Sequence, residues 1–180
     1  MLTRLIAALK RSWVSIRVIG TFLFLIVAFF MILTWSPIVD RIDLGAGLAQ
    51  LAAWMSYGIL WVLGHVMGYD LDLRGTIMSS GDFVVDVAPA CSGAVPTSIY
   101  LAAVFAYPTS WRARGIGAVI GVTVIHLVNL LRVSALFLIG LYFHEIFHES
   151  HVYVAQALVV CVAVALWLYW ATRFADAPAH

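Results

Sequence analysis

Charged side chains are scarce in this chain. Only 11% of its 180 residues are Asp, Glu, Lys or Arg, against roughly 25% in a typical soluble domain, while 64% are hydrophobic. This balance excludes an ordinary soluble globular protein and predicts a single integral membrane domain over residues 1–180. The net charge of +1 gives no indication of nucleic-acid binding.

Cysteine is almost absent as well. Two residues cannot build a disulfide framework, so each needs its own explanation. Cys161 lies in the middle of an apolar run and is interpreted as a small packing residue. Cys91 lies in VDVAPACSGAVPTS, between a strand-like run and a long apolar run. A cysteine just before a helix is close to backbone N–H groups that favour a thiolate, although simple packing is the alternative.

The apolar runs predict an all-α integral membrane helical bundle with about four transmembrane helices, each needing about 20 residues. A further apolar segment, 44–68, contains Gln50, Ser56 and His65, and we expect an interfacial or re-entrant helix there. Residues 71–87 alternate apolar and polar side chains around SSGD, which predicts a small outer β-hairpin. The four predicted spans are residues 18–35, 93–107, 115–143 and 152–172.

The basic residues orient the chain, because they are enriched in cytoplasmic loops. Residues 1–17 resemble a basic amphipathic helix on the cytoplasmic surface. With the N-terminus inside, segment 44–68 must begin and end outside. The alternative has five spans and an outer N-terminus, which puts four basic residues on the wrong side. The residues placed inside are Arg4, Lys10, Arg11, Arg17, Arg112, Arg114 and Arg173.

Helical rise then predicts which polar residues share one depth. Arg132 follows Gly115 by 17 residues, or about 25 Å at 1.5 Å per residue, and so lies just below the outer boundary of a core of about 30 Å. Cys91 is at the same level, as is the outer loop YFHEIFHESH with its histidines. Arg132 could merely snorkel to the interface, and each histidine could be an ordinary polar loop residue. The loop histidines are His144, His148 and His151.

Cysteine, histidine and arginine together suffice for nucleophilic acyl transfer. The thiolate attacks a carbonyl and forms a thioester, the histidine carries the proton, and the arginine stabilises the thiolate and the oxyanion. No cofactor is needed for this chemistry.

A metal-based alternative is present in the same loop. His144-Glu145-Ile146-Phe147-His148 matches H-E-x-x-H, in which two histidines bind zinc and the glutamate acts as base. This would make the chain an intramembrane zinc metalloprotease. The motif is short, and a third ligand is not evident. A non-enzymatic alternative is a small transporter or assembly subunit, with Arg132 and His126 along a polar path.

The order ACSG, then NLLRV, then a histidine before the last apolar run resembles the exosortase/archaeosortase family of membrane cysteine transpeptidases. The resemblance covers roughly residues 44–172, and its compactness is similar to the type called exosortase H. It implies that residues 44–90 form an interfacial helix and hairpin and that residues 91–172 form the catalytic core. It also implies that Cys91 is the nucleophile, Arg132 the family's arginine and His151 the general acid/base, with His148 or His144 as the alternatives.

The same resemblance implies a protein-sorting enzyme of the cell inner membrane. Its partners would be secreted proteins that carry a C-terminal motif, a transmembrane helix and a basic tail. The enzyme would cleave near the motif on the outer face and transfer the new carboxyl end to a lipid, a glycan or water.

Overall fold

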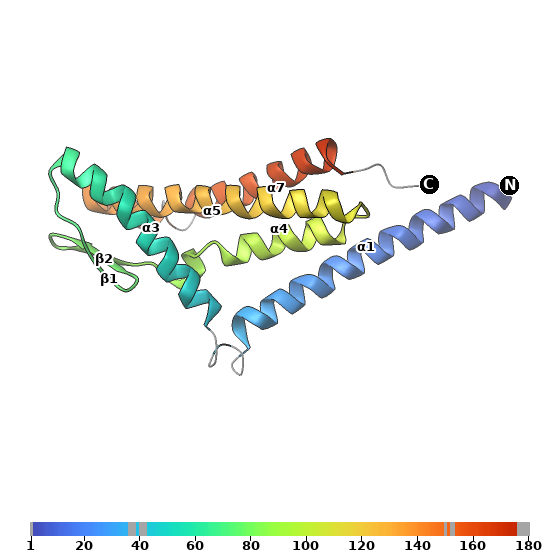
Figure 1. Ribbon diagram of the computed structural model, residues 1–180, viewed down its shortest axis with the longest axis horizontal. Coiled ribbons are helices and arrows are strands. Elements are labelled where there is room, and N and C mark those ends of the chain that lie inside the picture. Colours follow the sequence, from blue (N-terminus) through green and yellow to red (C-terminus); the bar gives the residue numbers. More distant parts are fainter. Residues whose placement is uncertain (1, 36–38, 40–42, 150, 152–153, 176–180) are drawn as a thin grey trace.

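The computed structural model describes residues 2–35, 39, 43–149, 151 and 154–175, without the side chains of residues 2–12, 14, 148 and 149. Three helices run lengthwise side by side: α4 (Ala94–Ala106), α5 (Trp111–Tyr142) and α7 (Ala155–Arg173), and α1 (Leu2–Thr34) slants away from them. A fifth, α3 (Leu44–Met67), crosses one end of them at an angle, beside a small sheet (Figure 1). The predicted all-α membrane bundle is therefore confirmed.

Four of the described helices are long and apolar enough to cross a membrane. Their number agrees with the prediction, but they are not the same four segments. The set includes α3, which the sequence suggested as interfacial, and leaves out α4, which has only 13 residues. Helix α4 follows the predicted run 93–107 within one residue at each end. Before it, Pro89–Cys91 forms a separate 3-10 turn, η1, and Gly93 takes a left-handed φ of 81°.

The basic N-terminal segment is not a separate helix. Residues 2–17 continue directly into the first span, and α1 is one uninterrupted helix as far as Thr34. Its neighbour in the bundle is α4, whose other sides pack against α5 and α7.

Helix α3 packs against the C-terminal part of α5. The side chain of Asp43 caps its N-terminus by accepting a 2.8 Å hydrogen bond from the amide of Ala46. That end contacts η1, because a Cβ on Gly45 would lie 3.4 Å from Cβ of Pro89. The other end is followed by Tyr69, whose ring meets that of Tyr142 at the end of α5. The helix therefore extends from the level of η1 to the far end of α5, and its interfacial or re-entrant character stays a prediction.

The predicted hairpin is present and has one more strand than expected. Strands β1 (Asp72–Arg74), β2 (Ile77–Ser80) and β3 (Phe83–Asp86) form an antiparallel sheet in the order β1-β2-β3. Two-residue turns join them, each beginning with a glycine of positive φ, Gly75 and Gly81. The sheet is fixed to α5 because the ring of Phe83 packs 5.4 Å from that of Phe137, where Gly140 leaves room for it.

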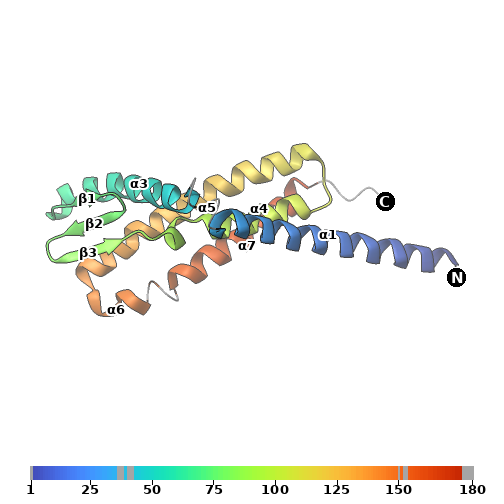
Figure 2. The ribbon, with the colours of Figure 1, turned by 90° about the horizontal axis from the view of Figure 1, so that it is seen from below.

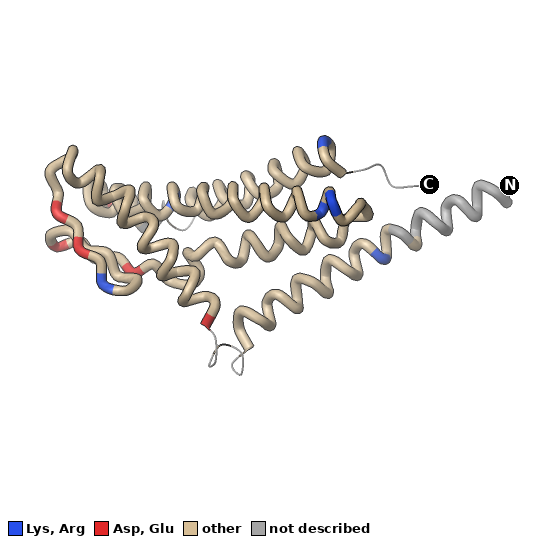
Figure 3. Tube along the Cα trace, in the orientation of Figure 1, with Lys and Arg blue, Asp and Glu red and all other residues tan. Residues whose placement is uncertain are grey.

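Charge is separated along the long axis of the described chain. Figure 3 shows basic residues near one end of α5 and of α7 and partway along α1, and most of the described aspartates at the end with the sheet, where one basic residue also lies. The pattern agrees with the charge asymmetry on which the predicted orientation rests.

Candidate functional site

The backbone after β3 brings Cys91 to the start of α4. The amide of Val87 donates the last hydrogen bond between β3 and the β2 side of the sheet, to the carbonyl of Thr76 at 3.0 Å. The amide of Cys91 then donates to the carbonyl of Ala88 at 2.8 Å. Pro89 occupies the first turn of η1, where a missing N–H costs nothing. The rigid sheet and turn thus place the thiol at a fixed point beside α5.

Asn129 of α5 holds this turn from the other side. Its Nδ2 donates a 2.8 Å hydrogen bond to the carbonyl oxygen of Cys91, and its side chain is only 1% exposed. A Cβ at Gly93 would come within 3.3 Å of the same amide group. Two features therefore require glycine at position 93: its positive φ and this close approach of the Asn129 side chain. The sequence showed Asn129 one turn from Arg132, but not that it binds the cysteine backbone.

His151 is the histidine that the structure brings to the cysteine. Its Nε2 lies 4.0 Å from Sγ of Cys91, and its ring stacks on Phe147 with centroids 6.0 Å apart. His144, one of the two alternatives, instead meets the ring of Phe83 edge-on at 6.2 Å. The side chain of His148, the other alternative, lies outside the described residues.

Arg132 lies inside the protein and does not extend toward water. It is 7% exposed, and its Nε has no hydrogen-bond partner among the described residues. Snorkelling would require an exposed guanidinium, so the burial disagrees with that alternative. Its positive charge lowers the pKa of Cys91, which means that the two groups are close enough to interact.

All effects together nevertheless raise the pKa of the Cys91 thiol above its ordinary value. Burial is the largest cause, since a thiolate loses hydration there; Arg132 lowers the pKa, and the carboxylate of Asp86 raises it again. The low-pKa thiolate expected from the position before a helix is therefore not what the structure supports. A raised pKa favours the neutral thiol, which needs a proton acceptor to become nucleophilic.

A small cavity surrounds these groups. Cys91, His151 and Asp86 line it together with apolar side chains from the sheet, from α5 and from α6 (His144–Glu149); these are Met78, Val85, Val87, Val133, Leu136, Phe137 and Phe147. The lining is mostly apolar, with Asp86, Cys91 and His151 as its few polar or reactive groups, which is typical of binding sites in proteins.

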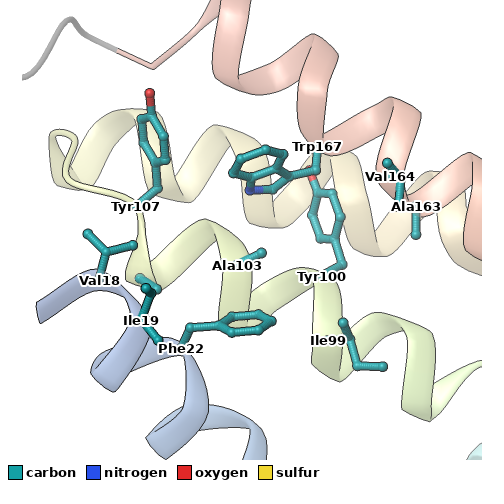
Figure 4. A pocket seen from close by; sticks show the side chains of 11 residues that line it. Val18, Ile19, Phe22, Ile99, Tyr100, Ala103, Tyr107, Ala163, Val164 and Trp167 are labelled. Atoms are coloured by element: carbon teal, nitrogen blue, oxygen red, sulfur yellow. The ribbon is translucent and has the colours of Figure 1, made fainter. Parts of the chain in front are cut away.

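A larger cavity of about 370 Å³ lies elsewhere, among α1, α4 and α7. Figure 4 shows Phe22, Tyr100 and Trp167 around it, and its lining is almost wholly apolar. It holds none of the predicted site residues and offers space for apolar chains within the membrane. Cys161, on α7, is exposed on the outside of the bundle, which differs from the packing role expected from the sequence.

Among the described residues, no group of three His, Cys, Asp or Glu side chains lies close enough together to hold a metal ion. Two positions of the H-E-x-x-H loop and its surroundings, His148 and Glu149, have no described side chains. The zinc alternative therefore rests on the sequence motif alone. Comparing the Glu145→Gln and Cys91→Ala variants decides it.

Comparison with known proteins agrees with the motif. The family model for transmembrane exosortases matches residues 5–170, and the chain therefore belongs to that family. The long apolar helices and this family together make it a multi-pass membrane protein. Neither a curated protein nor a solved structure matches the chain.

Proposed function

We propose that this exosortase is a membrane cysteine protease or transpeptidase that uses Cys91 as its nucleophile. The observation that carries the proposal is the approach of Cys91 Sγ and His151 Nε2 to 4.0 Å, next to a buried arginine whose charge acts on the thiol. These are the three groups that thiol-based acyl transfer requires.

The raised pKa of Cys91 dictates how the reaction begins. His151 accepts the thiol proton as Sγ attacks the scissile carbonyl, since little thiolate exists beforehand. The buried guanidinium of Arg132 then stabilises the negative oxygen of the tetrahedral intermediate. The C–N bond breaks, His151 returns the proton to the departing amine, and a thioester remains on Cys91.

The second half-reaction releases the substrate. An acceptor with an O–H or N–H group attacks the thioester while His151 removes its proton, and the thiolate leaves and is reprotonated. Asn129 contributes by keeping the Cys91 backbone in place throughout. No metal or organic cofactor takes part in these steps.

The proposed substrates are secreted proteins with a C-terminal motif, a transmembrane helix and a basic tail. Cleavage occurs on the outer face of the inner membrane, and a membrane lipid, a glycan or water is the acceptor. The charge separation of the described chain supports this orientation, with the sheet end outside.

Two experiments test the proposal. Replacing Cys91 by alanine in the producing cell should leave such proteins with their C-terminal tails intact, as seen by proteomics of tail peptides. A reporter active only outside the cytoplasm should work when fused after Ser79 and be silent when fused after Arg114. Unchanged tails, or the reverse reporter pattern, would refute the assignment.

A further inference from the structure

The sheet next to the cysteine has an unpaired edge. Strand β3 pairs with β2 alone, and Figure 2 shows it on the side of the sheet away from α3. The amide of Val87 points to β2, where it bonds to Thr76. Because successive residues of a strand alternate in direction, Val85 and Phe83 also face β2, and the backbone groups of Val84 and Asp86 point outward.

Three of these outward groups are available for pairing. The carbonyl of Asp86 already accepts from the amide of Ala88 at 3.0 Å. The N–H and C=O of Val84 and the N–H of Asp86 have no hydrogen-bond partner among the residues that the structure describes. Val84 is also 61% exposed, so the edge is not covered.

This edge leads into the cavity of the candidate site. Val85, Asp86 and Val87 line the cavity together with Cys91 and His151. The carboxylate of Asp86 is near enough to Cys91 to raise the pKa of the thiol. A chain paired with β3 would therefore continue past the thiol and the imidazole.

We propose that the recognition segment of the substrate binds as an added strand along the free edge of β3, which carries its scissile bond to Cys91. An extended peptide is the occupant that fits, because it alone supplies N–H and C=O groups at the spacing of Val84 and Asp86. Alternate side chains of such a strand would enter the cavity beside Phe147 and provide sequence selectivity. This inference rests on the proposed function, since it names how the same site holds its substrate.

Val84→Pro tests the edge with little disturbance of the sheet. Proline removes the outward N–H of residue 84 and leaves the hydrogen bonds between β2 and β3 in place, which is tolerated on an edge strand. Proteins that keep their tails in a Cys91→Ala strain first define the substrates. In a Val84→Pro strain the processing of these same proteins should fall about tenfold, the effect of one lost hydrogen bond that leaves an acceptor unpaired.

The rate at which N-ethylmaleimide alkylates Cys91 shows whether the site itself is intact. It is measured in the Cys161→Ala background, so that Cys91 is the one cysteine that reacts. We expect the Val84→Pro variant to react at the unaltered rate. Normal processing in this variant would overturn the proposal. A failure of the proposed function is recognised separately, because then the Cys91→Ala strain itself shows no retained tails.

If the proline variant also changes the alkylation rate, photocrosslinking shows instead whether the substrate segment lies along the edge of β3. p-Benzoylphenylalanine is placed at position 84, and at Arg74 on the opposite strand as the control, in the Cys91→Ala background where uncleaved substrate accumulates. We expect position 84 to capture the segment just before the transmembrane helix of the retained proteins. Adducts only with lipid or with a second copy of this chain, or equal capture from position 74, would overturn the proposal.

Discussion

The side-chain amide of Asn129 donates to the main-chain carbonyl of Cys91 at 2.8 Å, across 38 residues of sequence. This bond fixes the thiol-bearing turn to α5, the same helix that carries Arg132 one turn further on. The relative position of the proposed nucleophile and the proposed oxyanion stabiliser thus depends on one buried side chain.

Replacing Asn129 by leucine should damage both stability and activity. The buried carbonyl of Cys91 loses its donor, which costs about 1–3 kcal/mol, and the turn is no longer held beside Arg132. We expect a lower thermal midpoint in detergent and slower processing. Ser134→Ala is the matched control on the same helix, because its buried hydroxyl has no hydrogen-bond partner within the described part of the chain, so its removal leaves no described group unpaired. Equal effects in the two variants would show that Asn129 merely fills space.

The pH dependence of Cys91 alkylation follows from the causes of its pKa shift. The thiolate is the reacting form, so with a raised pKa the rate should be low near neutrality and still be climbing above the pH at which an ordinary thiol is half ionised. Asp86→Asn removes a negative charge and should move the profile to lower pH, whereas Arg132→Gln should move it to higher pH. Shifts in the opposite directions would contradict the placement of these charges.

Arg132→Lys separates charge from geometry. Lysine keeps the positive charge but lacks the planar fork of donors, and a compact ammonium cannot occupy the same buried site with the same hydrogen-bond directions. We expect normal accumulation in the membrane and a loss of processing of more than about tenfold, or ~1.4 kcal/mol in the transition state. Near-normal processing would mean that only the charge matters.

The sequence predicted well those features that depend on local pattern. Hydropathy identified the apolar helices, and the alternation around SSGD identified the hairpin. The bounds of α4, Ala94 and Ala106, lie within one residue of the predicted run 93–107, but with 13 residues this helix is shorter than the span that the sequence predicted. A third strand was missed because Gly75 turns the chain within what looked like one strand.

At the site, the sequence pattern predicted a common depth for Cys91, Arg132 and His151 but not the surroundings of the thiol. The grouping of Cys91 with His151 agrees with the predicted common level. The raised pKa of the thiol was not foreseen, because desolvation depends on apolar side chains from the sheet and α5 that come together only in the fold. The role of Asn129 likewise required the tertiary contact, since its partner is a main-chain carbonyl.

Thiol chemistry and zinc chemistry would use neighbouring residues at the sheet end of the bundle, and substitutions separate the two. If Cys91 is the nucleophile, Cys91→Ala abolishes processing and Cys91→Ser nearly does so, because a serine hydroxyl in this site lacks an acidic proton. His151→Ala should be as severe, since the neutral thiol then has no proton acceptor at 4.0 Å. Tail processing in the producing cell and in membranes is the measurement.

Glu145→Gln is the matched control in the same experiment. Glu145 is exposed on α6, so glutamine occupies the same space and only the ability to act as a base is lost. Thiol chemistry predicts a mild effect of this variant and no effect of a strong chelator. Zinc chemistry predicts the inverse of every result, because the metal needs its glutamate base and has no use for the thiol. Full activity in Cys91→Ala together with its loss in Glu145→Gln would overturn the thiol assignment, since no step through Cys91 could then be required.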